Sequence, residues 1–265
     1  MSRYKLLALD LDGTLLNSAM RMSEANTEAL SEAKAAGLAI VLATSRWFGL
    51  AKRTSDRLGL ETPIICSNGA EVRYPDGREI LHLPLDAEAT REVVTWGDDH
   101  GWEMFTTVGH ATYMQMRPGI IPEKLPGGLR IAERHSDHLG EGAATCVQIW
   151  QENAVREVGE RFGPKYGDRV HFSFNTPVGQ PHYVVLNHPD AEKAHALEIV
   201  CRELGISRAE TVAMGDSESD IEMLRFAGLG IAMRNSPDEV KRAAIHVAPT
   251  NDEDGVAWAV RRFLL

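Results

Sequence analysis

The chain has 265 residues, of which 43% are apolar and 25% charged, so it is long enough for one large domain or two of ordinary size. Its formal net charge is −10, and Lys and Arg residues do not cluster in any part of the sequence. An acidic surface repels nucleic acid and anionic lipid. We therefore predict neither a nucleic-acid nor a membrane partner, whereas a small anionic substrate is compatible with a local site of opposite charge.

The cysteines and the first residues bear on the cellular compartment. Cys66, Cys146 and Cys201 each lie in an apolar run, and the chain has no Cys-x-x-Cys. This pattern predicts buried, reduced thiols in a cytoplasmic protein. Residues 1–16 are apolar but contain Lys5 and Asp10, which predicts no signal peptide, and no apolar run approaches the roughly 18 residues of a membrane span.

The first third of the chain alternates short apolar segments with helical patterns. The predicted elements are strands at 4–10, 38–44 and 63–69, a helix from Ser23 to Gly37 and a helix at 46–58. Continuous Ile, Val and Leu strands between helices are typical of a parallel sheet covered on both faces. Residues 71–82 follow with the pattern of a hairpin around Pro75-Asp76-Gly77.

The pattern changes between about residue 84 and residue 187. The predicted elements are helices at 86–99 and 152–162 and strands at 102–107, 111–116, 144–150, 169–174 and 182–187. Adjacent strands with occasional helices indicate an antiparallel sheet backed by helices. The stretch from Pro118 to Gly142, rich in Gly and Pro, is the least regular part of the chain.

The alternation of helices and strands returns at Pro189. Four helices are predicted: one at 190–204, one at 221–228, one that begins at Pro237, and one at the end of the chain. Strands are predicted at 211–215, 229–233 and 245–249. We therefore predict an α/β fold, a Rossmann-like doubly wound parallel sheet of six strands with an α+β domain inserted in it. Residues 1–82 and 188–265 form the discontinuous core, and residues 83–187 form the insert.

Two acidic residues close the first strand, in the segment Asp10-Leu11-Asp12-Gly13-Thr14. Because side chains two apart in an extended segment leave it on the same side, the two carboxylates lie close together. Such a pair is unfavourable unless a cation or a shared proton relieves it, and a site with oxygen ligands only suits Mg²⁺. The alternative is a capped strand end followed by a solvated turn.

Further motifs follow in order. They are Thr44 after the second strand, Lys193 on the helix after the insert, Gly-Asp-Ser-Glu-Ser-Asp at 215–220 and Asn-Asp-Glu-Asp-Gly-Val-Ala at 251–257. Over essentially its full length the chain resembles the haloacid dehalogenase superfamily of phosphotransferases, specifically the Cof-type members with a large α+β cap (subfamily IIB). The resemblance implies a Mg²⁺-dependent phosphomonoesterase for small soluble phosphates, sugar phosphates first, whose cap at 83–187 closes over the site and chooses the substrate.

The resemblance also implies residue roles. Asp10 would accept the phosphoryl group as an acyl phosphate, and Asp12 would protonate the leaving oxygen and then deprotonate the hydrolytic water. A dehalogenase has no use for that acid, so Asp12 favours phosphoryl chemistry. Lys193 would neutralise charge on the transferring group. Asp10, the backbone carbonyl of Asp12 and Asp216 would bind Mg²⁺, with Asp220 supporting the metal site.

Weaker expectations concern the phosphate oxygens and the rest of the substrate. Thr44, Ser45, Ser219 and Lys193 would contact the phosphoryl group, and Arg46 the non-phosphate part of the substrate. Taken singly, a threonine before a helix is usually an N-cap and a lysine on an amphipathic helix is usually solvated. Trp47 and Phe48, which follow Arg46, are expected to pack in the helix or against the cap.

The chain departs from the family pattern at four positions, Ser45, Ala194, Ser219 and Arg234. Two alternatives to a phosphatase stay open, of which the second is motivated by Ser45, Ser219 and Arg234. A phosphomutase of the same fold would be activated by a sugar bisphosphate with little net phosphate release. A non-catalytic module would bind a phosphorylated ligand without turnover. The segment from His135 to His138 is either a solvated loop of the insert or a second metal site.

Overall fold

The computed structural model describes residues 3–117, 125–175 and 182–265, which form two compact units. The first comprises Met1–Arg46, Ala51–Leu81 and Glu192–Leu265, and the second Trp47–Leu50 and His82–Ala191. The insertion of one unit into the sequence of the other follows directly from these ranges. Residues 118–124 of the predicted irregular stretch lie outside the described part of the chain.

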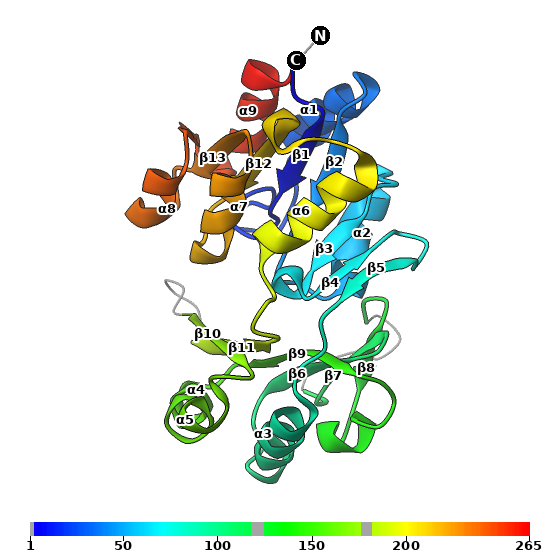
Figure 1. Cartoon of the computed structure of the whole chain (residues 1–265), viewed down its shortest axis with the longest axis vertical. Coiled ribbons are helices and arrows are strands. Elements are labelled where there is room, and N and C mark those ends of the chain that lie inside the picture. Colours follow the sequence, from blue (N-terminus) through cyan, green and yellow to red (C-terminus); the bar gives the residue numbers. More distant parts are fainter. Residues whose placement is uncertain (1–2, 118–124, 176–181) are drawn as a thin grey trace. The chain divides into compact units, whose positions relative to one another are not determined.

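A parallel sheet forms the centre of the first unit (Figure 1). Its strands, in spatial order, are β14 (His246–Ala248), β13 (Leu229–Met233), β12 (Thr211–Gly215), β1 (Leu6–Leu9) and β2 (Ala39–Leu42). In this register Leu6 lies opposite Thr211 on one side and Ala39 on the other. Every residue of β1 is buried, as continuous apolar strands require, and the predicted α/β class is confirmed.

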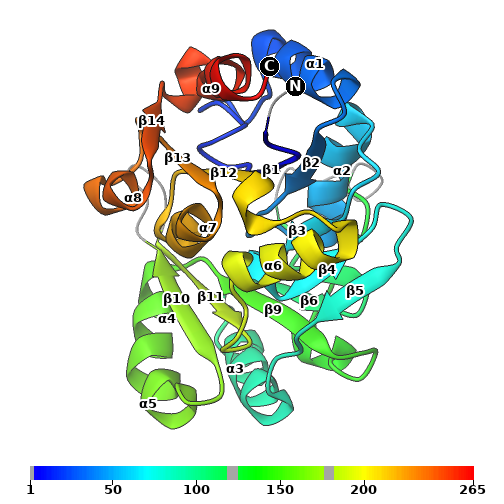
Figure 2. The same ribbon diagram turned by 45° about the horizontal axis from the view of Figure 1, so that its top comes forward.

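Helices cover both faces of this sheet. They are α1 (Glu24–Ala35), α2 (Phe48–Leu58), α6 (Lys193–Leu204), α7 (Ile221–Phe226), α8 (Asp238–Ala243) and α9 (Gly255–Phe263). Side chains of α6, α7 and α8 share a core with Val41, whereas residues of α1 and α2 lie around Ile40, which points to the opposite face. Figure 2 shows α1 and α9 side by side. The sheet is thus wound on both faces, as predicted.

One predicted parallel strand lies outside the main sheet. An isolated parallel bridge joins Ala43, the residue after β2, to Ile65 of β3 (Ile64–Cys66). β3 belongs instead to a three-stranded sheet with β4 (Glu71–Arg73) and β5 (Glu79–His82), in which β3 and β4 are antiparallel. The expectation of six strands in one parallel sheet is therefore wrong by one strand. The predicted hairpin is confirmed as β4 and β5.

A buried ion pair lies in β4, where Glu71 and Arg73 are two residues apart and contact each other. Glu71 is 1% exposed, and Arg73 also bonds the exposed Glu79 at 2.9 Å. Burial raises the pKa of Glu71 to about 7, against the attraction of Arg73 and with repulsion from Glu79. Folding therefore retains a proton that the unfolded chain releases above its ordinary pKa of 4.5.

We expect Glu71→Gln to change the pH dependence of stability. For the wild type, Glu71 makes the free energy of unfolding fall by on the order of 3 kcal/mol as the pH rises through about 4.5 to 7, because only the folded state binds the proton. The amide does not titrate, so this component disappears in the variant. Urea unfolding of both proteins at pH 5 and pH 8 measures the difference, with Glu61→Gln, an exposed change away from the ion pair, as the control. Equal falls in wild type and Glu71→Gln would contradict the assignment.

The second unit has its own six-stranded sheet. The strands in spatial order are β10 (His171–Asn175), β11 (Tyr183–Asn187), β9 (Ala144–Ile149), β6 (Met104–Val108), β7 (Ala111–Met114) and β8 (Leu129–Ile131). The pairs are antiparallel, as predicted, except for β7 and β8. One face packs on α3 (Ala87–Asp99), α4 (Glu152–Glu157) and α5 (Gly163–Tyr166), with Val93, Phe162 and Tyr166 in the core.

Two features of this unit differ from the prediction. The sequence pattern did not indicate β8, whose three residues pair with β7 in parallel and carry too short a pattern to stand out. The predicted helix at 152–162 is interrupted by a π-helical turn at Val158–Phe162 before α5 begins. Pro164, which has no backbone N–H to donate, stands at the start of α5 and favours this break.

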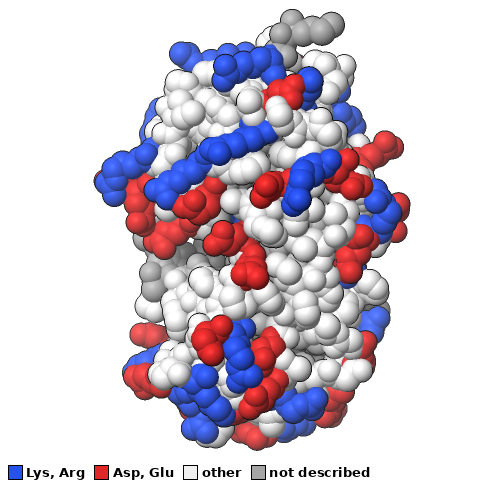
Figure 3. Space-filling model, viewed as in Figure 1, with Lys and Arg blue, Asp and Glu red and all other residues white. Residues whose placement is uncertain are grey.

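Three further expectations can be compared with the structure. All three cysteines are buried and free, as predicted. Figure 3 shows acidic and basic side chains intermixed on the face in view, in keeping with the absence of a basic block in the sequence. Within the described ranges, no helix combines the length and apolar character needed to cross a membrane.

Candidate active site

The candidate site lies at the carboxyl ends of the central strands of the first unit. Asp10 follows β1 directly, and its backbone N–H donates to Met214 of β12 at 3.0 Å. Asp216 follows β12, and Lys193 is the first residue of α6. Because β1 and β12 are parallel neighbours, residues 206 positions apart in the sequence meet at one edge of the sheet.

Lys193 joins two of the carboxylates. Its Nζ donates to Oδ1 of Asp10 at 2.8 Å and to Oδ1 of Asp220 at 2.7 Å. All three residues are buried, with Lys193 only 2% exposed. Burial disfavours the charged amine, but the two carboxylates raise the pKa of Lys193 above its ordinary value, so it stays a cation. The alternative of a solvated helix lysine is therefore wrong.

Both carboxylate oxygens of Asp220 accept hydrogen bonds. Lys193 donates to Oδ1, and Oδ2 accepts from the backbone N–H of Asp216 at 3.0 Å and of Ser217 at 2.9 Å, and from the Ser217 hydroxyl at 2.9 Å. Ser217 and Asp220 form a capping box around the short 3₁₀ turn Glu218–Asp220. This network fixes the backbone from which the Asp216 side chain projects.

Three carboxylates converge without enough positive charge to balance them. One oxygen each of Asp10, Asp216 and Asp220 lies within 4.8 Å of the others. Burial raises the pKa of Asp10 well above its ordinary range, with Lys193 opposing, and burial and Asp220 raise the pKa of Asp216 to about 7. A divalent cation removes that repulsion, and an all-oxygen donor set suits a hard ion such as Mg²⁺. The residues present therefore fit a metal.

Residues that the sequence reasoning did not single out shape the loop after β1. The Thr14 hydroxyl donates to Oδ1 of Asp216 at 2.9 Å, and the Asn235 amide donates to the Gly13 carbonyl at 2.8 Å. Asn251 donates to the carbonyl of Leu16 at 2.9 Å. Thr14 and Asn251 stand in the motifs themselves, whereas the signal for Asn235 was only its place after a buried strand.

The predicted phosphate ligands lie in two places. Thr44 is fully buried two residues after β2, and its N–H donates to the Ile65 carbonyl at 2.9 Å. Ser45 follows it and is partly exposed. Ser219 is exposed, and its hydroxyl lies 2.9 Å from that of Ser217. Arg234, a departure from the family pattern, pairs with exposed Glu253 at 3.3 Å.

Arg46 and Asp12 face each other across the site. The Arg46 Nε donates to Oδ2 of Asp12 at 2.7 Å and its Nη2 to Oδ1 at 2.5 Å, a bidentate pair. The Asp12 side chain is 38% exposed and the Arg46 side chain 14%. The next residue, Trp47, stacks on Phe105 with ring centroids 5.8 Å apart, so its expected packing role is confirmed inside the second unit.

At Gly13 the loop after β1 passes close to the Asp216 carboxylate. Its φ is +79°, and a Cβ there would lie 2.2 Å from Oδ2 of Asp216. We expect Gly13→Ala to displace that carboxylate and lower turnover by about 100-fold, because small misplacements of catalytic groups have effects of that size. Gly37→Ala is the matched control, with φ +90° and no atom within 4 Å of the added carbon. Phosphate release and thermal unfolding are measured for both variants, since both add backbone strain but only Gly13→Ala displaces Asp216. Equal activities of the two variants would contradict the expected displacement.

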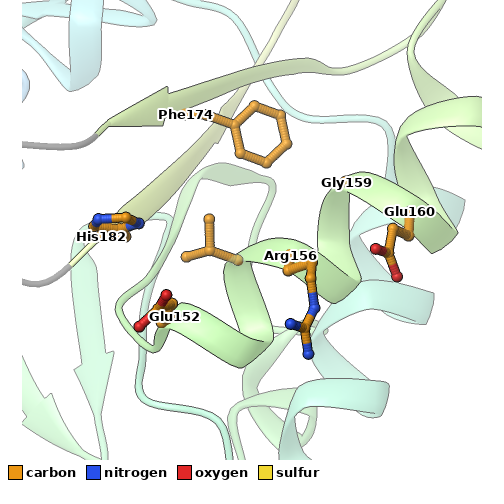
Figure 4. Close-up of a pocket in the computed structure, with 7 residues that line it drawn as sticks. Glu152, Arg156, Gly159, Glu160, Phe174 and His182 are labelled. Atoms are coloured by element: carbon orange, nitrogen blue, oxygen red, sulfur yellow. The ribbon is translucent and has the colours of Figure 1, made fainter.

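The second unit contributes two features outside this cluster. His135 is fully buried, with Nδ1 2.9 Å from the Thr106 hydroxyl, whereas Asp137 is exposed, so the interpretation as a solvated loop fails for His135 only. Among the described residues, the three-carboxylate cluster is the one group of three or more such side chains close enough to share a metal. A pocket of about 280 Å³ lies beside α4, with the Phe174 ring above Gly159 (Figure 4). None of the predicted site residues lines it.

Comparisons with known proteins agree with this geometry. The model of the haloacid dehalogenase-like hydrolase family matches residues 7–260. Phosphatase YwpJ of Bacillus subtilis is 31% identical, over 98% of this chain and all of that protein. The 5-amino-6-(5-phospho-D-ribitylamino)uracil phosphatase YcsE of the same organism is 30% identical, over 98% and 96%. The solved structure of BT4131, described as a subclass IIB sugar phosphatase, has a TM-score of 0.78 at 22% identity, covering 98% of this chain and all of that one.

The chain belongs to the haloacid dehalogenase-like hydrolase family. Its resemblance to the Cof-type members with an α+β cap is confirmed by the family match and by the fold. The named phosphatases among its relatives also confirm the predicted enzyme class, a phosphoric monoester hydrolase.

Proposed function

We propose that the chain is a Mg²⁺-dependent phosphomonoesterase that acts on small soluble phosphates, sugar phosphates first, through an aspartyl phosphate. The observation that carries the proposal is the buried contact of Lys193 with Asp10, beside Asp216 and at the carboxyl edge of the parallel sheet. An acidic cluster with one buried cation is suited to phosphoryl transfer, where charge stabilisation and positioning dominate.

The residues divide the reaction as follows. Asp10 attacks phosphorus, and the bond to the leaving oxygen breaks as Asp12 donates its proton to that oxygen. Asp12 then takes a proton from the water that attacks the aspartyl phosphate, which releases phosphate and regenerates Asp10. Lys193 offsets charge on Asp10 and on the phosphoryl oxygens, which Thr44, Ser45 and Ser219 also contact.

Asp10, the backbone carbonyl of Asp12 and Asp216 would hold Mg²⁺, with Asp220 keeping Asp216 in place through its backbone. When bound, the ion supplies the positive charge that lets an anionic ester approach buried carboxylates. We assign catalysis to the core at 1–82 and 188–265, and substrate choice to the cap at 83–187. The buried free thiols and acidic charge support action in the cytoplasm on small phosphate esters, without nucleic acid or membrane.

A panel of phosphate esters tests the proposal. The purified chain is assayed with p-nitrophenyl phosphate, hexose phosphates and a phosphorylated ribityl compound, in Mg²⁺ and in excess EDTA. We expect phosphate release that requires Mg²⁺ and differs between esters. Phosphate release that is unchanged by EDTA would contradict the metal requirement. Activation by a sugar bisphosphate without net phosphate would identify a mutase, and Mg²⁺-dependent binding without turnover would identify a binding module.

A further inference from the structure

Asp12 needs a fixed orientation for the task assigned to it. It stands in the loop after β1, and its side chain is 38% exposed, so no packing surrounds the carboxylate on all sides. An exposed aspartate samples several rotamers, and proton transfer needs one of them, aimed at the leaving oxygen.

The Arg46 guanidinium removes that freedom. Each of two N–H groups meets a different oxygen of Asp12, at 2.7 and 2.5 Å, so the fork sets both the position and the plane of the carboxylate. A planar bidentate pair fixes orientation in a way that a single point charge does not.

The backbone of Arg46 is itself held from both sides. Its N–H donates to the Thr44 hydroxyl at 3.2 Å, and its carbonyl accepts from the N–H of Ser67 at 2.9 Å. The N–H of Asn68 donates to the Thr44 carbonyl at 3.1 Å. Ser67 and Asn68 adopt left-handed backbone conformations, with φ of 49° and 57°. Two successive non-glycine residues rarely adopt them, and here this strained turn supplies the N–H groups that hold the segment from Thr44 to Arg46.

We propose that Arg46 is a positioning residue that orients Asp12 for proton transfer, rather than a contact for the non-phosphate part of the substrate. The inference rests on the proposed function, in which Asp12 donates to the leaving oxygen. Each carboxyl oxygen has a second lone pair besides the one that faces Arg46, and one of these carries the proton that is transferred. It predicts an effect that depends on the leaving group. An alkoxide leaves only with a proton, whereas p-nitrophenolate is a stable anion and leaves without one.

The experiment measures first-turnover release of the alcohol at saturating substrate for Arg46→Gln, with Mg²⁺ present. For an alkyl phosphate from the panel, such as glucose 6-phosphate, we expect release to fall by about 100-fold. For p-nitrophenyl phosphate we expect a change of less than about 3-fold in that step, since it requires no proton donor. KM for the alkyl phosphate stays close to the wild-type value. Arg46→Lys keeps the charge but not the fork, and we expect it to lose about 10-fold with the alkyl phosphate.

Arg234→Gln, which removes an exposed arginine paired with Glu253, is the control and should leave both rates unchanged. Equal losses for the two substrates, wild-type rates in Arg46→Lys, or a rise in KM with unchanged release would each overturn the inference. Failure of the proposed function is distinguishable, because the wild type itself would then release no alcohol from either ester.

Discussion

Asp10→Asn is expected to abolish Mg²⁺-dependent turnover of p-nitrophenyl phosphate, with a loss on the order of 10⁴-fold or more, as for other removed nucleophiles. The substitution is nearly isosteric, and the amide oxygen still accepts from the Lys193 amine that lies 2.8 Å from Asp10. It lacks the negative charge that attack on phosphorus requires. Release of p-nitrophenol at saturating Mg²⁺ measures the loss.

Stability separates this loss from misfolding. Burial and the neighbouring carboxylates raise the pKa of Asp10, so the variant loses an unfavourable charge and should unfold at the same or a higher temperature without metal. Asp56→Asn, an exposed change in the pair with Lys52, serves as the matched control and should keep full activity. Acid-quenched wild type should retain labelled phosphate, and the variant should not. Turnover of Asp10→Asn within about 10-fold of wild type would show that this carboxylate is not the nucleophile.

Lys193→Met is expected to lower turnover by about 1,000-fold, because it removes the buried cation that offsets charge at the reacting centre. Methionine fills a similar volume, so the effect is electrostatic rather than a cavity. The change also leaves Asp10 and Asp220 without their shared partner, which destabilises the fold by about 3–5 kcal/mol. Phosphate release and urea unfolding measure the two effects.

A second substitution separates the two effects of losing Lys193. Asp220→Asn in the Lys193→Met background removes one uncompensated carboxylate, and should restore much of the stability but none of the activity. Lys52→Met, at a partly exposed lysine, is the control and should change neither quantity appreciably. Full activity in the stabilised double variant would show that Lys193 acts only through folding.

Helices and strands were predicted correctly from local sequence patterns where capping residues or continuous apolar runs mark their ends. Ser23 caps α1 by accepting from the Asn26 N–H at 3.1 Å, and Gly205 ends α6 with φ +65°, both by mechanisms visible in the sequence. Short or interrupted elements were harder to predict. β8 has only three residues, which pair with β7, and the π turn at Val158–Phe162 interrupts an otherwise helical pattern.

The sequence by itself predicted which residue types stand at the candidate site, since Asp10 and Asp12 follow the first strand and Lys193 lies on the helix after the insert. Only the tertiary structure decided which of them pair. Lys193 contacts Asp10, which lies 183 positions earlier in the chain, and both carboxylate oxygens of Asp12 accept from Arg46. Which side chains pair depends on the order of the strands in the sheet and on burial. Lys193 at the start of α6 is buried and therefore donates to two carboxylates instead of to water. Neither strand order nor burial is encoded in the spacing of residues along the chain, because parallel strands from distant segments become neighbours only when the sheet forms.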